Sequence, residues 1–107
     1  MRLRSAVSSN DSDFTFVAAV SDALGHPSRV EIVRYVTQKN TVRNDVCNKD
    51  LVENLPSSQA TISQHVKKLL EAEVLIVRKE NGFSFYTVNR EILARYVSLL
   101  QSELMGD

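Results

Sequence analysis

The sequence has little of what a secreted or membrane-bound chain would need. It contains one cysteine, Cys47, so no disulfide can form within a chain, and a lone thiol fits a reducing compartment. It has no apolar run of about 18 residues, the length that would indicate a membrane-spanning helix. Met1 to Arg4 is followed by the polar residues 8–13 rather than by the apolar segment of a signal peptide. The sequence therefore predicts a cytoplasmic protein with no membrane partner.

Motifs of common catalytic sites are also missing. With three glycines in total, the chain has no glycine-rich phosphate loop, and it contains neither Gly-x-Ser-x-Gly nor His-Glu-x-x-His. No carboxylate cluster accompanies a histidine in a way that suggests acid-base chemistry. We therefore expect no enzymatic activity and no cofactor.

Net charge is zero, because 13 basic residues balance 13 acidic ones. Domains that bind nucleic acid usually carry a basic excess, so this balance argues against such a partner. The charges are unevenly distributed, however. Residues 57–90 hold two more basic than acidic side chains, and residues 91–107 hold two more acidic than basic ones. A local basic face is therefore compatible with the neutral chain, and two copies would have to bind together.

The most informative feature that is present is a capped amphipathic helix at residues 58–72. Its apolar side chains recur at helical spacing, at Ile62, Val66, Leu69 and Leu70. The opposite face is small, polar and partly basic, with Ala60, Ser63, Gln64, Lys67 and Glu71. Ser57 or Ser58 follows Pro56 where an N-cap is needed, which sets the start of the helix.

A β-hairpin is predicted directly after this helix. Two β-prone runs, residues 74–80 and 83–88, flank Asn81-Gly82, and both central residues of a type I′ turn need positive φ. Arg78 and Lys79 lie near the hairpin tip, where charge is often merely solvated. A polar helix face beside a basic ribbon nevertheless suits duplex DNA.

The first half of the chain predicts a disordered tail and two helices. Residues 1–12 lack periodicity and are expected to be disordered, so the folded domain is expected over residues 13–105. Asp13 can cap a first helix that Gly25 ends, and Pro27 suits the first position of a second. The expected buried positions of the second helix are Val30, Ile32, Val33 and Val36.

A third, short helix is expected over residues 49–54, with Leu51 and Leu55 facing the core. Val46 and Cys47 fit either a strand or the start of this helix. The tight connection at residues 55–58 makes the third and fourth helices a helix-turn-helix. Asn89 can cap a last helix, whose wide apolar face covers the domain's own core or pairs with a second copy.

These pieces together resemble the ArsR/SmtB family of dimeric winged-helix repressors. The resemblance rests on residues 23–33 (ALGHPSRVEIV), Asp50-Leu51, residues 58–69 (SQATISQHVKKL) and the hairpin ending in Tyr86, and it covers residues 14–104. It implies a mainly α winged helix-turn-helix of about five helices plus a β-hairpin wing. It further implies a homodimer joined through the first and last helices, reading an inverted-repeat operator in double-stranded DNA. The implied interface residues are Phe14, Val17, Val20, Ile92, Tyr96, Leu99 and Leu100.

On this interpretation the helix at residues 58–72 reads the major groove. The expected base contacts are Gln59, Ala60, Ser63 and Gln64, and the expected phosphate contacts are Thr61, Lys67 and Lys68. Arg78 and Lys79 would reach the flanking backbone or minor groove from the wing. Ser58 is also expected among the DNA-binding residues. Capping is the alternative role for Ser58 and Gln59, solvation is the alternative for Lys67 and Lys68, and packing is favoured over base readout for His65.

Many members of the family sense metals, but the ligand positions do not match. The family's thiol site reads Cys-Val-Cys-Asp-Leu, whereas this chain has Cys47-Asn48-Lys49-Asp50-Leu51, and a protonated lysine cannot ligate a cation. Residues 90–107 contain no histidine for the other common site. We therefore expect no metal, and the inducer is not specified by any motif. Two alternatives stay open: a repressor that responds to redox conditions through Cys47, and a winged helix that binds protein rather than DNA.

Overall fold

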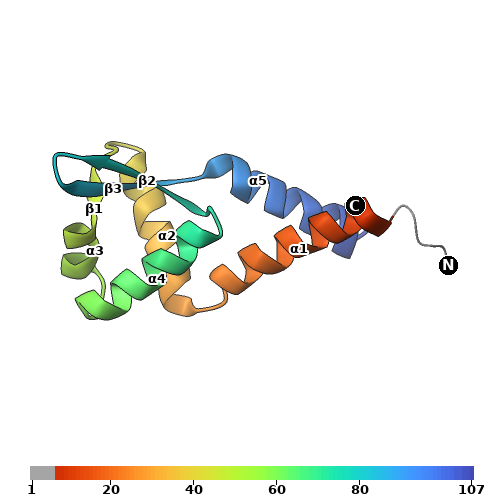
Figure 1. Ribbon diagram of the computed structural model, residues 1–107, viewed down its shortest axis with the longest axis horizontal. Coiled ribbons are helices and arrows are strands. Elements are labelled where there is room, and N and C mark those ends of the chain that lie inside the picture. The colour runs from red at the N-terminus through yellow and green to blue at the C-terminus, as the bar shows by residue number, and fades with distance from the viewer. Residues whose placement is uncertain (1–6) are drawn as a thin grey trace.

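The computed structural model describes residues 7–107 as an elongated molecule with two parts (Figure 1). Its elements are α1 (Val7–Ala23), α2 (Pro27–Asn40), β1 (Val46–Cys47), α3 (Asn48–Asn54), α4 (Gln59–Glu71), β2 (Leu75–Glu80), β3 (Phe83–Val88), α5 (Arg90–Leu99) and the π-helical turn η1 (Leu100–Leu104). We call α2 to β3 the body. Helices α1 and α5, with η1, extend from it side by side, and we call them the arm.

The amino end of the arm differs from the sequence-based expectation. Helix α1 begins at Val7, so it extends into the segment for which disorder was predicted, and residues 1–6 lie outside the described residues. Asp13, expected as the cap, lies inside the helix instead. Its carboxylate accepts a hydrogen bond from Arg95 of α5 at 3.1 Å, and the Arg95 guanidinium also covers the ring of Phe16 at 4.0 Å. Asp13 therefore joins the two arm helices rather than starting one of them.

A three-stranded antiparallel sheet of order β1-β3-β2 contains the predicted hairpin. Asn81 and Gly82 have φ values of 51° and 82°, as a type I′ turn requires, and the register runs from Leu75 opposite Val88 to Glu80 opposite Phe83. Val46 pairs with Tyr86 on the edge of β3 opposite β2. Val46 and Cys47 therefore form a strand and not the start of α3. The spacing of residues alone left this open, because a two-residue strand has too few residues to show a period.

The core lies between the sheet, α2, α4 and α3, and its fully buried side chains include Ile32, Val36, Val46, Leu51, Ile62, Leu69 and Leu75. Val30, expected among them, is half exposed. It precedes Ile32 by two residues, which is about 200° around a helix, so the two cannot share a face. The expected burial of Val30 was therefore wrong, while that of Ile32 and Val36 is confirmed.

The starts of α2, α4 and α5 follow the predicted residues, while Gly25 acts differently from the prediction. Ser58 caps α4 and Asn89 caps α5, each through its side-chain oxygen, and Pro27 is the first residue of α2. Gly25 follows α1 without a left-handed conformation. A Cβ there would lie 3.2 Å from the carbonyl oxygen of Ser21, so the glycine permits a close backbone approach. Within residues 7–107, no helix is long and apolar enough to cross a membrane.

Candidate nucleic-acid interface

Helices α3 and α4 form the predicted helix-turn-helix, with α4 anchored through its apolar stripe. Ile62, Val66 and Leu69 are at most 3% exposed, and Leu51 of α3 is fully buried beside them. Ser58 fixes the start of α4: its Oγ accepts from the Thr61 N–H at 3.3 Å and lies 3.1 Å from Thr61 Oγ1. Ser58 therefore acts as the N-cap of α4, which is the alternative role expected for it, and its hydroxyl satisfies a free N–H group of the first turn.

The opposite face of α4 is exposed along its whole length. Its exposed residues comprise all the predicted base contacts, Gln59, Ala60, Ser63 and Gln64, and also Thr61, Lys67 and Lys68. These side chains lie on one helix, whose amino end faces away from the core. The arrangement offers amide and hydroxyl groups together with one methyl group, which are the groups that recognise base edges in a major groove.

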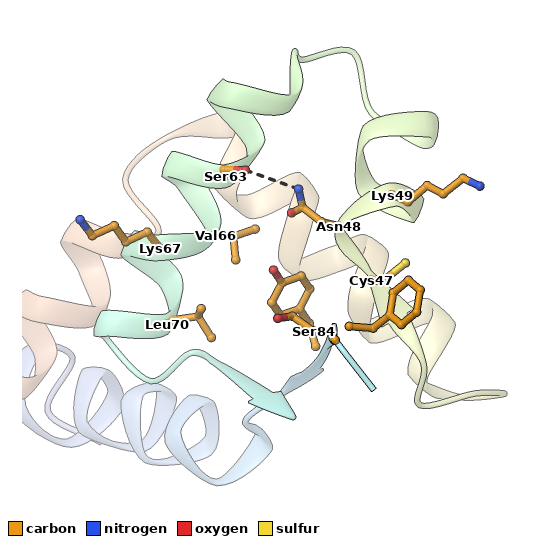
Figure 2. A pocket seen from close by; sticks show the side chains of 11 residues that line it. Cys47, Asn48, Lys49, Ser63, Val66, Lys67, Leu70 and Ser84 are labelled. Atoms are coloured by element: carbon orange, nitrogen blue, oxygen red, sulfur yellow. Dashed lines mark hydrogen bonds between the residues drawn. The ribbon is translucent and has the colours of Figure 1, made fainter. Parts of the chain in front are cut away.

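Asn48 at the start of α3 holds one of these polar groups in place (Figure 2). Its Nδ2 donates to Ser63 Oγ at 3.4 Å, while its Oδ1 is buried and has no hydrogen-bond partner. The sequence analysis missed Asn48, because a contact between residues 15 apart leaves no periodic signal. Its effect is to orient Ser63 from the neighbouring helix.

Asp50 anchors the start of α3 against the loop before it. Its Oδ2 accepts from the Cys47 N–H at 2.9 Å and from Cys47 Sγ at 3.4 Å, and Oδ1 lies 3.3 Å from the Arg43 guanidinium. Burial acts to raise the pKa of Asp50, but the Cys47 N–H and thiol and Arg43 outweigh it, so the pKa lies below its usual value. Asp50 therefore stays ionised and pins α3. The charges of Arg43 and Lys49, the basic residues near Cys47 in sequence, pair with carboxylates: Arg43 with Asp45 and Asp50, and Lys49 with Glu53.

The wing places its two predicted basic residues differently. The Arg78 guanidinium pairs with Glu80 at 2.6 Å, donates to the Asn44 carbonyl at 3.1 Å and covers the Phe85 ring at 4.9 Å. Lys79 is exposed and belongs to no ion pair found within residues 7–107. Lys79 also points to the sheet face that carries its partner Ser84, the face toward α3 and α4, since side chains alternate along a strand. Lys79 is thus the freer cation, and Arg78 stiffens the wing.

The cations of α4 differ in the same way. Lys68 lies 3.7 Å from Glu71 of the same helix, whereas Lys67 is exposed and enters no ion pair that the described residues form. Lys67 and Lys79 are therefore the two cations of the predicted set that are ready for an external anion. Lys67 borders the opening between α4 and the wing, and Lys79 lies on β2 of the wing.

A pocket of about 450 Å³ lies between α3, α4 and the wing (Figure 2). Its lining residues are Cys47, Asn48, Lys49, Ser63, Val66, Lys67, Leu70, Gly82, Phe83, Ser84 and Tyr86. Figure 2 shows Lys49 directed away from it. Burial raises the pKa of Tyr86, with Cys47 adding to the effect, so the phenol stays neutral. The pocket separates the reading face of α4 from the wing tip, where Phe83 is 60% exposed.

The residues expected at a dimer interface divide into two groups. Val20 is fully buried in the chain's own core, and Ile92 and Tyr96 pack against that core from α5, with Tyr96 Oη 2.8 Å from Ser21 Oγ. The sequence analysis grouped these positions with the surface, because periodicity cannot tell which neighbour covers an apolar face. Phe14, Val17 and Leu99 line a shallow groove of about 230 Å³ along the arm instead, and Leu100 is half-buried.

The thiol-site positions do not fit a metal. Cys47 Sγ is directed to Asp50, and the Lys49 ammonium, 79% exposed, pairs with Glu53 at 3.9 Å. Within the part of the chain that the structure describes, no three His, Cys, Asp or Glu side chains gather in a way that could hold a metal ion. We derive no metal-dependent step from these positions.

Comparison with known proteins identifies the architecture. The family described as "bacterial regulatory protein, arsR family" matches residues 26–77, from the start of α2 into β2. The arsenical resistance operon repressor of Staphylococcus xylosus is 31% identical over 77 residues, which span 72% of this chain and 69% of that protein. The chain belongs to the arsR family of bacterial regulatory proteins.

Solved structures share the fold. An ArsR-like transcriptional regulator from Rhodococcus superposes with a TM-score of 0.73 at 20% identity, over 83% of this chain and 79% of the other. The homodimeric winged helix-turn-helix DNA-binding domain of a possible ArsR-family regulator from Mycobacterium bovis gives 0.69 at 20% identity, over 95% and 88%. The predicted winged helix-turn-helix of the arsR family is therefore confirmed, and the family to which the chain belongs is one of transcriptional regulators.

Proposed function

We propose that this arsR-family protein is a homodimeric repressor that reads an inverted-repeat operator with α4 and holds the flanking DNA with its wing. The observation that carries the proposal is the exposed face of α4, where Gln59, Ala60, Ser63 and Gln64 stand beside the free cation Lys67. A single helix of this kind covers a few base pairs. Two copies related by a twofold axis would read two half-sites about one helical turn apart.

The arm supports the dimeric part of the proposal. Phe14 is 47% exposed, Val97 50% and Leu104 70%, and these apolar side chains lie on α1, α5 and η1. Exposed apolar side chains gathered on two neighbouring helices are typical of a surface that another chain covers. The M. bovis domain with the same fold is described as homodimeric, which favours the same assembly here.

The neutral chain sets the expected character of DNA binding. Per copy, the α4 and wing cations not engaged with carboxylates are Lys67 and Lys79, so few phosphates are neutralised by one copy. Two copies would double the number, and the logarithm of the binding constant would fall linearly with the logarithm of salt concentration. A winged helix that binds protein instead would have no DNA affinity even at low salt, and this outcome would replace the proposal by that alternative.

The decisive experiment selects bound duplexes from a random pool and then measures affinity for the enriched site. We expect an inverted repeat, and we expect Ser63→Ala with Gln64→Ala to weaken binding by about 100-fold, since each base contact is worth about 1–3 kcal/mol. Gln38→Ala, an exposed glutamine on α2 of the body, is the matched control and should bind as the wild type does. Retained specific binding by the double variant would contradict the assignment of α4 as the reading helix.

The redox alternative has its own test on the same operator. Cys47→Ser should leave affinity unchanged under reducing conditions, because the serine hydroxyl can still donate to Asp50. If peroxide or a persulfide releases the wild type but not Cys47→Ser, the repressor responds through this thiol. If both proteins respond alike, Cys47 serves only to position α3.

A further inference from the structure

Arg29, in the first turn of α2, joins the arm to the reading helix. Figure 1 shows the junction of α1 and α2 near which it lies. Its Nη1 donates to the carbonyl oxygens of Asp22 and Ala23, at 3.2 and 3.4 Å, at the carboxyl end of α1. Its Nε donates to His65 Nδ1 of α4 at 3.1 Å. One side chain of α2 thus contacts the last turn of an arm helix and the inner side of α4. A cation there also favours the negative end of α1.

His65 is the polar member of an otherwise apolar buried face. It is 8% exposed, and its ring lies 4.6 Å from the ring of His26, measured between centroids. His26 caps α2 by accepting from the Ser28 N–H at 3.2 Å. To accept from Arg29, His65 Nδ1 must carry no proton, so the contact exists only when the imidazole is neutral.

The charged groups around His65 all act against its protonation. Burial is the largest effect that lowers the pKa of His65 below its usual value, and His26 and Arg29 lower it further. From α1, Asp22 reaches the cluster through its carbonyl oxygen, and it shares the adjoining cleft with Lys68 and Glu71 of α4. The Lys68 ammonium pairs with Glu71 at 3.7 Å. Among the contacts described for His65, no carboxylate neutralises an added positive charge.

We propose that Arg29 and His65 form a proton-sensitive joint that sets the angle between the arm and the reading helix, so that operator binding weakens when His65 is protonated. The inference rests on the proposed function, in which the arm carries the dimer interface and α4 carries the base contacts. Protonation removes the acceptor of the Arg29 Nε–H and places two cations in contact. Helix α4 then keeps its apolar stripe and the Asn48–Ser63 hydrogen bond to α3, but it loses its polar link to the arm, so the two reading helices of a dimer lose their fixed separation.

The sign of the expected effect is unusual for a DNA-binding protein. Acidification adds positive charge and ordinarily strengthens binding to phosphate. Here the folded state resists protonation of His65, so the joint is intact above pH 6.5, the usual value for histidine, and weakens as the pH falls further. We expect the affinity of the wild type for its operator to fall about tenfold between pH 7.5 and 5.0, a typical size for coupling between two parts of a protein.

The test measures operator affinity at both pH values for the wild type and three variants. His65→Gln keeps an acceptor that does not titrate, so it should bind tightly at pH 7.5 and change less than about twofold at pH 5.0. His65→Phe keeps the size of the side chain but has no hydrogen-bond acceptor, and it should bind the operator about tenfold more weakly than the wild type at pH 7.5, with little further change at pH 5.0. His26→Asn keeps a capping side chain and tests whether the neighbouring imidazole is the group that titrates; its operator affinity should still fall between pH 7.5 and 5.0, with the fall beginning at a somewhat higher pH because His26 no longer lowers the pKa of His65.

The possible outcomes separate this inference from the proposed function. Circular dichroism and sedimentation first establish that each protein is folded and has the same oligomeric state at both pH values. If the wild type selects no DNA at pH 7.5 and low salt, the proposed function itself fails. If the wild type binds equally at both pH values, if His65→Gln shows the same fall, if His65→Phe binds normally, or if His26→Asn abolishes the response, the joint is refuted while DNA binding stands.

Discussion

The body and the arm differ in how completely they bury their apolar side chains. In the body, α4 buries Ile62 and Leu69 almost completely and exposes mainly polar groups on its other face. In the arm, α5 has no buried residue at all, and Val97 and Leu104 are half or more exposed. The core is therefore completed within one chain, by the body together with Val20 at the end of α1, whereas the outer part of the arm carries apolar surface that a further chain could cover. The proposed functions divide in the same way, with DNA recognition proposed for the body and dimer assembly proposed for the arm.

The largest expected effect tests the completeness of the body. Leu51→Ala should lower the free energy of unfolding by about 2–5 kcal/mol, since it opens a cavity beneath the helix-turn-helix. Leu104→Ala, at a position 70% exposed, should change it by less than about 0.5 kcal/mol when measured on the monomer. Denaturant unfolding at low protein concentration provides both values. Similar losses for the two variants would remove the distinction between body and arm.

The second effect tests whether the arm needs a partner. Phe14→Glu should raise the dissociation constant of the proposed dimer by about 100-fold, because it would bury a charge in an apolar interface. Val42→Glu makes the same chemical change at a valine that is 81% exposed in the loop after α2, and it should leave the dimer intact. Sedimentation over a range of concentrations measures both. A dimer undisturbed by Phe14→Glu would place the interface elsewhere.

The smallest effect concerns the wing. Lys79→Gln should reduce the salt slope of operator binding by about one for each copy, with a loss of a few-fold in affinity, because one phosphate contact is removed. Lys39→Gln is the matched control, because the Lys39 ammonium stacks on the Tyr35 ring at 5.5 Å on α2. Titrations at several salt concentrations give the slope. An unchanged slope would mean that the wing does not touch the DNA backbone.

Much of the body was predictable because its determinants are local. The apolar stripe of α4, the Ser58 cap and the Asn81-Gly82 turn each depend on residues within a few positions of one another, and all three were found as predicted. The exposed polar face of α4 follows from the same periodicity. The residues that specify a winged helix-turn-helix thus lie close together in the sequence, within short segments.

The arm was less predictable. The spacing of apolar residues indicates that a helix face is buried, but it does not show which element or chain covers that face. Val20, assigned to the dimer interface, lies in the core, and Val30, assigned to the core, is half exposed. The start of α1 at Val7 also escaped prediction, since polar residues 8–13 give no stripe. These errors share one cause, which is that the neighbour of each face is decided by the packing of distant elements.

The sequence by itself determined the helix-turn-helix, the hairpin turn and the chemical character of the reading face, since each arises from spacing along the chain. Tertiary structure alone decided the pairing of β1 with β3, the hydrogen bond from Asn48 to Ser63, and the hydrogen bonds by which Arg29 links the end of α1 to His65. Those contacts join residues between 7 and 40 positions apart. No periodicity encodes such a distance, and only the folded chain brings these groups within hydrogen-bonding range.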